Sequence, residues 1–406
     1  MSNIVSYMQE DQRTFAESPF NPADSLVFST LSYFNFEACT LVDPASDARV
    51  LLHDVVSLSD WDALTRASWL EDAKDTRTFL QALMASRRYR NVTLAFYANE
   101  RSDAVEKQFS ATTFFLADGT EGIRERACLA FRGTDGSFAG WKEDFNLCFK
   151  SVIPSQCTAA AYVSGVASAT GGPLVVTGHS KGGNLAEFAS LVADDAAYAR
   201  IEAVYNHDGP SFLEDPSPRR ADGAFDALLH KTVPESSAFG MILERRADYR
   251  VVRSSALSVF QHEPFSWIVE GEDFSYQDEL NPSARFFDDT LDAWLRSKTP
   301  EERERFIDTI YDLFVSTQAS TWAEFQTKLL GNTRQMLGRG SRLDPETRSF
   351  VLKTLGSLAS VLRDETVKRF RPSPPEWLPK RQERYDEEAC TNAGEQDRGR
   401  EGKERA

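Results

Sequence analysis

The sequence predicts an α/β fold in which a mostly parallel β-sheet is flanked by helices on both faces. Three observations lead to this prediction. Apolar, β-branched runs such as LVVT at 174–177 are typical of buried parallel strands. These runs alternate along the chain with segments whose apolar residues recur at helical spacing. The chain has 406 residues, of which 41% are hydrophobic, and this is enough to bury a sizeable core.

The first predicted elements are a helix and two strands. Residues 22–36 carry an apolar helical stripe, and we expect Asp24 to cap this helix. From residue 91 the apolar pattern changes to that of a strand. Residues 91–99 and 109–119 are predicted to form two strands, joined by a polar turn around 101–103.

The elements that follow alternate between strand and helix. Residues 127–131 predict a buried strand, and 132–140 predict a polar, glycine-rich loop. A helix is predicted at 153–168, and it leads to the LVVT strand. Two later apolar runs, 201–210 and 249–255, are also predicted to be strands. This alternation is how consecutive parallel strands are connected.

The C-terminal third has a different pattern. From about residue 281 the chain reads as amphipathic helices. We therefore predict an α/β domain at 1–280 and a helical C-terminal region at 281–370, which is a possible surface for a protein partner. Residues 371–406 contain prolines and then charges with few apolar side chains, which predicts a disordered tail.

The segment GHSKG at 178–182 is the strongest functional motif. It fits G-x-S-x-G and lies between a predicted strand and a predicted helix, which is the setting of a nucleophile elbow. We predict that Ser180 is a nucleophile and that Gly178 and Gly182 let the strand and the helix approach closely. The start of the helix would direct the N–H of Lys181 toward an oxyanion.

A serine hydroxyl needs a base, and His262 is the predicted base. It follows the strand predicted at 249–255, in a loop where a base can reach the edge of the sheet. The other histidines fit less well. His179 lies inside the elbow. The side chains of His207 and its neighbour Asp208 leave the end of a strand in opposite directions. His230 lies in an apolar stretch of helical spacing.

Asp208 is the predicted acid, because it closes a strand at the carboxyl end, where ligand-facing residues collect. The chain order Ser180, Asp208, His262 is then that of a Ser-Asp-His triad. Glu235 and Asp248 remain open as alternative acids.

A second oxyanion donor is predicted in the loop after the strand at 127–131. Thr134 follows Gly133 there, so its N–H and its hydroxyl could both point at a tetrahedral oxygen. Together with the N–H of Lys181 it would form an oxyanion hole. Apolar residues within 210–246 suggest either a lid or acyl pocket, or an ordinary core helix.

Several of these motifs resemble known lipases. LAFRGTDGSFAGWKEDF at 129–145 resembles the F-R-G-T segment of the fungal-type class 3 lipases, and GHSKGGNLA at 178–186 resembles their G-H-S-L-G-G-A-L-A. VYNHDGPSF and HEPFSW are similar to segments of a lipase-like bacterial family of unknown function, numbered 2974. The resemblance implies an α/β-hydrolase fold and places Ser180, Asp208 and His262 in the triad positions. Lys181 replaces the lipase Leu, so its cation would favour an anionic group or form an outward salt bridge.

The composition of the chain indicates which partners, compartments and cofactors to expect. The formal net charge of −16 argues against nucleic acid or an anionic membrane surface as the main partner. We expect no integral membrane segment and no signal peptide. Five scattered cysteines predict neither a disulfide framework nor a metal site, so we expect a cytoplasmic protein without a cofactor.

The resulting prediction is a serine hydrolase of carboxylic esters, similar to lipases and esterases (EC 3.1.1), acting on a small-molecule or lipid ester. The alternative is a catalytically silent protein of the same fold that acts as a protein-interaction module.

Overall fold

The protein is described by a computed structural model that covers residues 2–353 with gaps. The gaps are 45, 66–72, 103–105, 117–124, 135–142, 144–145, 148–149, 221–222, 247, 283, 287, 290, 292–298, 316, 318–343, 347 and 350–351. All described residues belong to one compact unit, Met1–Glu365. The predicted tail and most of the predicted C-terminal helices lie outside the described residues, so the domain boundaries at 280 and 370 stay predictions.

Within the described residues, nine strands form one mixed sheet in the order β1-β2-β3-β4-β5-β6-β7-β8-β11. The strands from β4 to β8 run parallel to their neighbours, and β1, β2, β3 and β11 pair antiparallel at the two edges. A small separate sheet pairs β9 with β10. The strand bounds are β1 (Val50–Leu51), β2 (Thr93–Ser102), β3 (Lys107–Leu116), β4 (Arg126–Phe131), β5 (Leu174–His179), β6 (Ile201–His207), β7 (Leu229–Pro234), β8 (Tyr249–Val252), β9 (Val269–Glu270), β10 (Asp273–Phe274) and β11 (Tyr276–Gln277).

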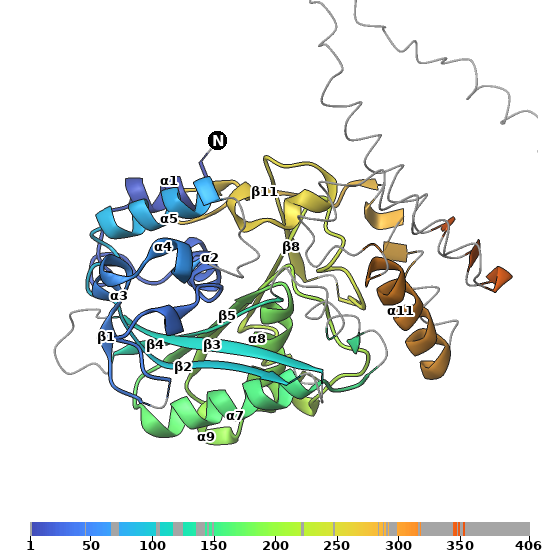
Figure 1. The fold of residues 1–406 in the computed structure, drawn as a ribbon, viewed down its shortest axis with the longest axis horizontal. Coiled ribbons are helices and arrows are strands. Elements are labelled where there is room, and N and C mark those ends of the chain that lie inside the picture. Colours follow the sequence, from blue (N-terminus) through green and yellow to red (C-terminus); the bar gives the residue numbers. More distant parts are fainter. Residues whose placement is uncertain are drawn as a thin grey trace, which may run out of the picture. The chain divides into compact units, whose positions relative to one another are not determined.

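Helices cover both faces of this sheet (Figure 1). Their bounds are α1 (Ile4–Glu10), α2 (Pro22–Leu31), α3 (Leu52–Leu58), α4 (Trp61–Leu64), α5 (Ala73–Ala85), α7 (Pro154–Ala169), α8 (Lys181–Val192), α9 (Asp195–Tyr198) and α11 (Pro300–Val315). Short 3₁₀ helices are η1 (Phe36–Ala38), η3 (Pro218–Arg220), η4 (Ser258–His262) and η5 (Pro264–Ser266). No helix in the described ranges is long and apolar enough to cross a membrane.

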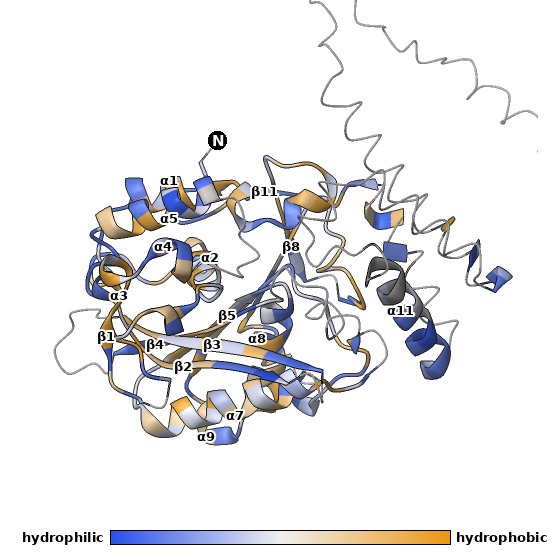
Figure 2. Ribbon diagram, in the orientation of Figure 1, coloured by the Kyte–Doolittle hydropathy of each residue, from blue (hydrophilic) through white to orange (hydrophobic). Residues whose placement is uncertain are grey.

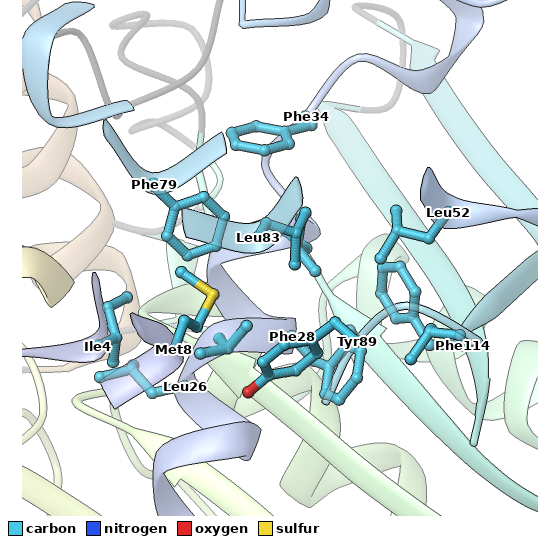
Figure 3. Close-up of a cluster of buried hydrophobic side chains, with 14 of the residues drawn as sticks. Ile4, Met8, Leu26, Phe28, Phe34, Leu52, Phe79, Leu83, Tyr89 and Phe114 are labelled. Atoms are coloured by element: carbon cyan, nitrogen blue, oxygen red, sulfur yellow. The ribbon is translucent and has the colours of Figure 1, made fainter. Parts of the chain in front are cut away.

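A hydrophobic core lies on each face of the sheet. Alternate residues of β4 divide between the two cores, as the pleat of a strand requires. Cys128 joins the core under α1, α2 and α5, and Leu129 joins the core under α7 and α8. Figure 3 shows part of the first core, where Phe28 of α2 packs on Phe114 of β3 with ring centroids 4.9 Å apart. Figure 2 shows hydrophobic residues along α7 and hydrophilic residues where β2 and β3 extend beyond the core.

The structure confirms the fold class and most predicted elements. The strand pair β2–β3, the strands β4, β5, β6 and β8, and the helices α7 and α8 lie where the apolar patterns place them. One sequence prediction is wrong in detail, because Asn21 is the N-cap of α2. Asp24 lies three residues later and completes a capping box, in which each side chain accepts from the other residue's backbone N–H.

His230 also differs from its prediction, because it lies in strand β7 and not in a helix. Its strand pairs with β6 on one side and β8 on the other. Tertiary pairing therefore overrides a local pattern with helical spacing. His230 stacks on Tyr205 of β6, with ring centroids 4.7 Å apart.

A buried ion pair joins α2 to the chain that follows α5. Arg88 donates to Asp24 Oδ2 at 2.5 Å and to Oδ1 at 2.8 Å, and both side chains are 0% exposed. The hydroxyls of Tyr7 and Tyr89 also donate to Asp24 Oδ1. The Asp24 carboxylate therefore ties α1, α2 and the segment after α5 together.

The segment between residues 210 and 246 is held on the sheet by buried charges. Lys231 of β7 pairs with Glu244, and each side chain is 1% exposed. Glu187 of α8 accepts from Arg220 and Arg246. The expectation of a core helix is wrong for the described part of this segment, which holds η3 and β7.

The buried Asp24–Arg88 ion pair predicts that substitutions of the neighbouring residues Arg87 and Arg88 have unequal effects on the free energy of unfolding. Arg88→Met leaves a buried carboxylate without its cation, and we expect a loss of about 3–5 kcal/mol in the free energy of unfolding. Arg87 pairs with Glu17 at the surface, with side chains 54% and 45% exposed. Arg87→Met should therefore change the free energy by less than about 1 kcal/mol. Urea unfolding measures both values, and similar losses in the two variants would contradict this assignment.

The buried carboxylate of Glu244 is predicted to contribute to unfolding in acid. Burial alone would raise its pKa, but Lys231 and Arg246 lower it to about 2 from a usual value of 4.5. A lowered folded-state pKa stabilises the fold above the unfolded-state value, so this stability is lost as pH falls from about 4.5 to about 2. Glu244→Gln should flatten the fall of the unfolding free energy in that window.

Glu202 is a matched control for this measurement, because it pairs with Arg126 but its side chain is 48% exposed. Glu202→Gln should keep the wild-type dependence on pH. A Glu244→Gln variant with the wild-type slope in urea unfolding between about pH 4.5 and about pH 2 would refute the prediction.

Candidate active site

Ser180 lies at a strained turn between β5 and α8. Its backbone has φ 59° and ψ −132°, which is unusual for a residue with a side chain. Ser180 N donates to His207 O of β6 at 2.9 Å, and Ser180 O accepts from Gly183 N at 2.9 Å. A strained serine between a buried parallel strand and a helix has the local geometry of a nucleophile elbow.

The two glycines of the motif are required by the close approach of main-chain segments. A Cβ atom on Gly178 would lie 2.1 Å from Gly182 O, and one on Gly182 would lie 2.1 Å from Phe131 O. Real Cβ atoms do not tolerate such distances, so a substitution at either position must displace the backbone. The strand–turn–helix unit therefore depends on glycine at both positions, as the sequence predicts.

Asp208 and His262 are in direct contact. Asp208 follows β6 with φ 53° and is fully buried, and its Oδ2 lies 2.6 Å from His262 Nδ1. The other carboxylate oxygen, Oδ1, accepts from the Ser237 hydroxyl at 2.5 Å and from Gly240 N at 3.0 Å. A carboxylate in this position accepts the proton of Nδ1, so the lone pair of His262 is on Nε2.

The residues around His262 fix its loop after β8. His262 ends η4 and is 5% exposed. The preceding Gln261 accepts from Ser236 N at 2.7 Å through Oε1, and from Trp267 Nε1 at 2.8 Å through its main-chain oxygen. The ring of Phe239 packs on the ring of His262 with centroids 4.5 Å apart. The segment after β7 and the loop after β8 therefore hold one another.

Ser180 and Asp208 follow the neighbouring strands β5 and β6, and His262 lies in the loop after β8. A Cβ on Gly209, next to Asp208, would lie 2.5 Å from Ser180 O. His179, next to Ser180, has its ring centroid 4.5 Å from that of His262. Ser180 therefore adjoins both the segment of the acid and the segment of the base.

The predicted oxyanion residues flank Ser180 on two sides. Lys181 is the first residue of α8, where backbone N–H groups have no partner within the helix. Thr134 is buried in the loop after β4. A Cβ on Gly133 of this loop would lie 3.1 Å from Ser180 Cβ, so the loop runs beside the nucleophile.

The side chain of Lys181 differs from its prediction, because it neither points outward nor faces an open anion site. It is 0% exposed, and Nζ lies 2.9 Å from Glu143 Oε2 and 3.0 Å from Gln108 O. Glu143 also accepts from the Ser155 hydroxyl at 2.7 Å. The charge of Lys181 is thus balanced inside the core, which removes the expected preference for an anionic group.

The alternative acids do not contact His262 Nδ1 in the way that Asp208 does. Glu235 accepts from Gln261 Nε2 at 3.1 Å, which places it beside the base loop as a support. Asp248 is exposed at the start of β8. The structure therefore pairs His262 with Asp208 among the three candidate acids.

His207, which the sequence sets aside, lies in the core with both ring nitrogens in use. Its Nε2 lies 2.7 Å from the Ser25 hydroxyl, and its Nδ1 lies 2.7 Å from the Thr232 hydroxyl. Burial, together with the nearby His230, lowers the pKa of His207 to about 3. Since both ring nitrogens are bound to hydroxyls inside the core, this imidazole does not face Ser180 as a base would.

Sequence reasoning missed Ser237, whose hydroxyl supports Asp208 from 29 residues away. It also missed a polar stripe formed by Ser25, Ser29 and Tyr33, which are spaced four residues apart. Ser29 of this stripe lies 2.8 Å from the hydroxyl of Thr177 on β5. Hydroxyls at i and i+4 of an apolar helix, with a third at i+8 just after its end, are a signal that could have been found.

Among the described residues, no three His, Cys, Asp or Glu side chains gather in a way that could hold a metal ion. The candidate site is made of Ser180, His262, Asp208 and the main-chain donors around them.

The chain is similar to a protein family and to a solved structure. No curated protein matches the sequence. A solved structure described as "Crystal structure of M37 lipase" is 13% identical to the chain, with a TM-score of 0.34. The match covers 53% of this chain and 68% of the other. The resemblance to class 3 lipases and to the family numbered 2974 stays a prediction. The model of the Mbeg1-like family matches residues 83–312, which is more than half of the chain, and the protein therefore belongs to this family.

Proposed function

We propose that this protein is a serine hydrolase of carboxylic esters, similar to lipases and esterases (EC 3.1.1). The observation that carries the proposal is the buried contact of 2.6 Å between Asp208 and His262, beside a serine with positive φ at a strand–helix turn. A serine, an aspartate and a histidine in this chain order on an α/β sheet are typical of acyl transfer. Family membership supports a hydrolase of this kind.

In the proposed reaction, Ser180 Oγ attacks the ester carbonyl carbon while His262 Nε2 takes the hydroxyl proton. Asp208 holds His262 with the proton on Nδ1 and stabilises the imidazolium that forms. His262 then gives the proton to the leaving alcohol, and an acyl group remains on Ser180. A water molecule, activated by the same imidazole, releases the carboxylic acid and restores the serine.

The negative charge on the carbonyl oxygen would be stabilised by the backbone N–H of Lys181 and by Thr134. Lys181 begins α8, so the positive end of the helix dipole adds to its N–H. Donors already in place before the reaction need no reorganisation, and loss of one such donor costs about 3 kcal/mol of transition-state stabilisation.

The proposed substrate is an ester that is uncharged around the scissile bond. The lysine after the nucleophile is neutralised by Glu143 and 0% exposed, so it offers no cation to an anionic substrate. Acylglycerols and other acyl esters fit this description.

Ser180→Ala tests the nucleophile. A fluorophosphonate probe should label the wild-type protein at Ser180 and leave the variant unlabelled. With p-nitrophenyl esters of graded chain length, the variant should lose kcat by a factor on the order of 10⁶, since the other triad members cannot act without it.

Ser190→Ala is the matched control, because Ser190 lies in α8, the helix that follows Ser180, and its buried hydroxyl donates to Ala186 O at 2.7 Å. It should keep labelling and activity. Esterase activity that survives in Ser180→Ala would contradict the proposal, as would a folded wild-type protein that the probe does not label.

Asp208→Asn tests the acid against Glu235. The amide would favour the wrong tautomer of His262, so kcat should fall by about 10⁴-fold with little change in KM. Glu235→Gln keeps an acceptor for Gln261 and should stay within about tenfold of the wild type. A larger loss in Glu235→Gln than in Asp208→Asn would reverse the assignment of the acid.

A further inference from the structure

His179 directly precedes the proposed nucleophile, and the proposed mechanism does not use its side chain. The residue is fully buried at the end of β5. Its Nε2 lies 2.8 Å from the main-chain oxygen of His262. A carbonyl oxygen can only accept, so Nε2 carries the proton and Nδ1 carries the lone pair.

Tyr33 completes the hydrogen bonds of this imidazole. Its hydroxyl lies 3.0 Å from His179 Nδ1, and since Nδ1 is the acceptor, the hydroxyl donates. The main-chain oxygen of His179 lies 3.3 Å from the same hydroxyl. One tautomer of His179 therefore satisfies both of its neighbours, Tyr33 and the His262 carbonyl.

The ring of His179 also packs on the proposed base. The ring centroids of His179 and His262 are 4.5 Å apart, with 38° between the planes. Phe239 packs on His262 at the same centroid distance. His262 is therefore held at three places. Its ring packs against His179 and Phe239, its main-chain oxygen accepts from His179, and its Nδ1 contacts Asp208.

His179 remains uncharged next to a ring that must accept a proton during catalysis. Burial lowers the pKa of His179 well below its usual value, and the proximity of His262 lowers it further. A charged His179 would repel the imidazolium of His262, whereas a neutral ring does not.

Tyr33 connects the same imidazole to the proposed oxyanion loop. A Cβ on Gly133 would lie 2.2 Å from the Tyr33 hydroxyl and 2.7 Å from His179 O. The hydroxyl of Tyr33, in the turn after α2, therefore lies where the loop after β4 and the elbow meet.

We propose that Tyr33 and His179 are a positioning pair for the base, which holds the His262 main chain so that Nε2 stays directed at Ser180. This inference rests on the proposed esterase function. Neither residue touches the reacting atoms, so both act through His262.

Two substitutions of His179 separate its two hydrogen bonds. A glutamine amide nitrogen reaches the position of Nε2, and an asparagine amide reaches only the position of Nδ1. His179→Gln therefore keeps the donor to His262 O, and His179→Asn removes it. We expect kcat for a p-nitrophenyl ester to fall by about 10²-fold in His179→Asn and to recover to within about tenfold of the wild type in His179→Gln, with KM unchanged in both.

Tyr33→Phe and Tyr162→Phe form the second matched pair. Tyr162 is partly buried in α7, where its hydroxyl donates to Phe96 O at 2.8 Å and contacts Thr113. Tyr33→Phe should lower kcat by about tenfold, because Nδ1 of His179 loses its donor. Tyr162→Phe removes a comparably bonded hydroxyl far from the triad and should leave kcat unchanged.

The low-field proton resonance of His262 Nδ1–H in NMR reads the position of the base without turnover. It should shift or broaden in His179→Asn and in Tyr33→Phe, and stay in place in His179→Gln and Tyr162→Phe. This readout separates two failures. A wild-type protein without esterase activity would refute the proposed function, while the resonance would still report whether His179 positions His262.

Equal losses of kcat in His179→Asn and His179→Gln would overturn the proposal, as would an unchanged resonance in both. Urea unfolding of each variant shows whether it is folded. If His179→Asn does not fold, Tyr33→Phe with its control decides the question through kcat and the resonance.

Discussion

The close approach of main-chain segments around the turn from β5 to α8 is the constraint on which the site depends. At Gly178 and Gly182 there is no room for a Cβ, because carbonyl oxygens of the helix start and of β4 occupy that space. Strand, helix and the loop after β4 can converge on Ser180 only under this condition. The same convergence holds Ser180 at positive φ, a strain that the surrounding packing must maintain. The side chains of Asp208 and His262 meet beyond the carboxyl ends of the parallel strands, where this turn also lies.

Buried ion pairs determine how the surrounding segments dock. The Lys181–Glu143 pair connects the start of α8 to the region before α7. The Lys231–Glu244 pair connects β7 to the segment that follows this strand. Desolvation makes such pairs poor sources of net stability, but a single partner left alone in the core is strongly unfavourable. Each pair therefore penalises any other docking of its segments. This explains how charged side chains directly beside the nucleophile contribute to geometry without presenting charge to a substrate.

Local patterns were sufficient to predict the elbow and the places of Asp208 and His262. Strand, glycine and helix signals at 174–190 are contiguous, and residues that end parallel strands meet at one edge of the sheet whatever lies between them. Partners that depend on tertiary docking could not be read in this way. Ser237 reaches Asp208 across 29 residues, and Tyr33 reaches His179 across 146. For the same reason His230 was assigned to a helical pattern, because the pairing of β7 with β6 and β8 outweighs that pattern.

Two histidines in register on neighbouring strands show how position decides the role of a side chain. His179 of β5 pairs with His207 of β6, both are buried, and burial lowers both pKa values. Hydroxyls from α2 and from the turn after it bind both rings, Ser25 of α2 on His207 and Tyr33 of the turn on His179. The second nitrogen of His207 meets Thr232 of the next strand, so that ring is closed within the sheet. The second nitrogen of His179 meets the main chain of His262. One residue pair with the same chemistry therefore gives a contact within the sheet on one strand and a contact with the His262 main chain on the other.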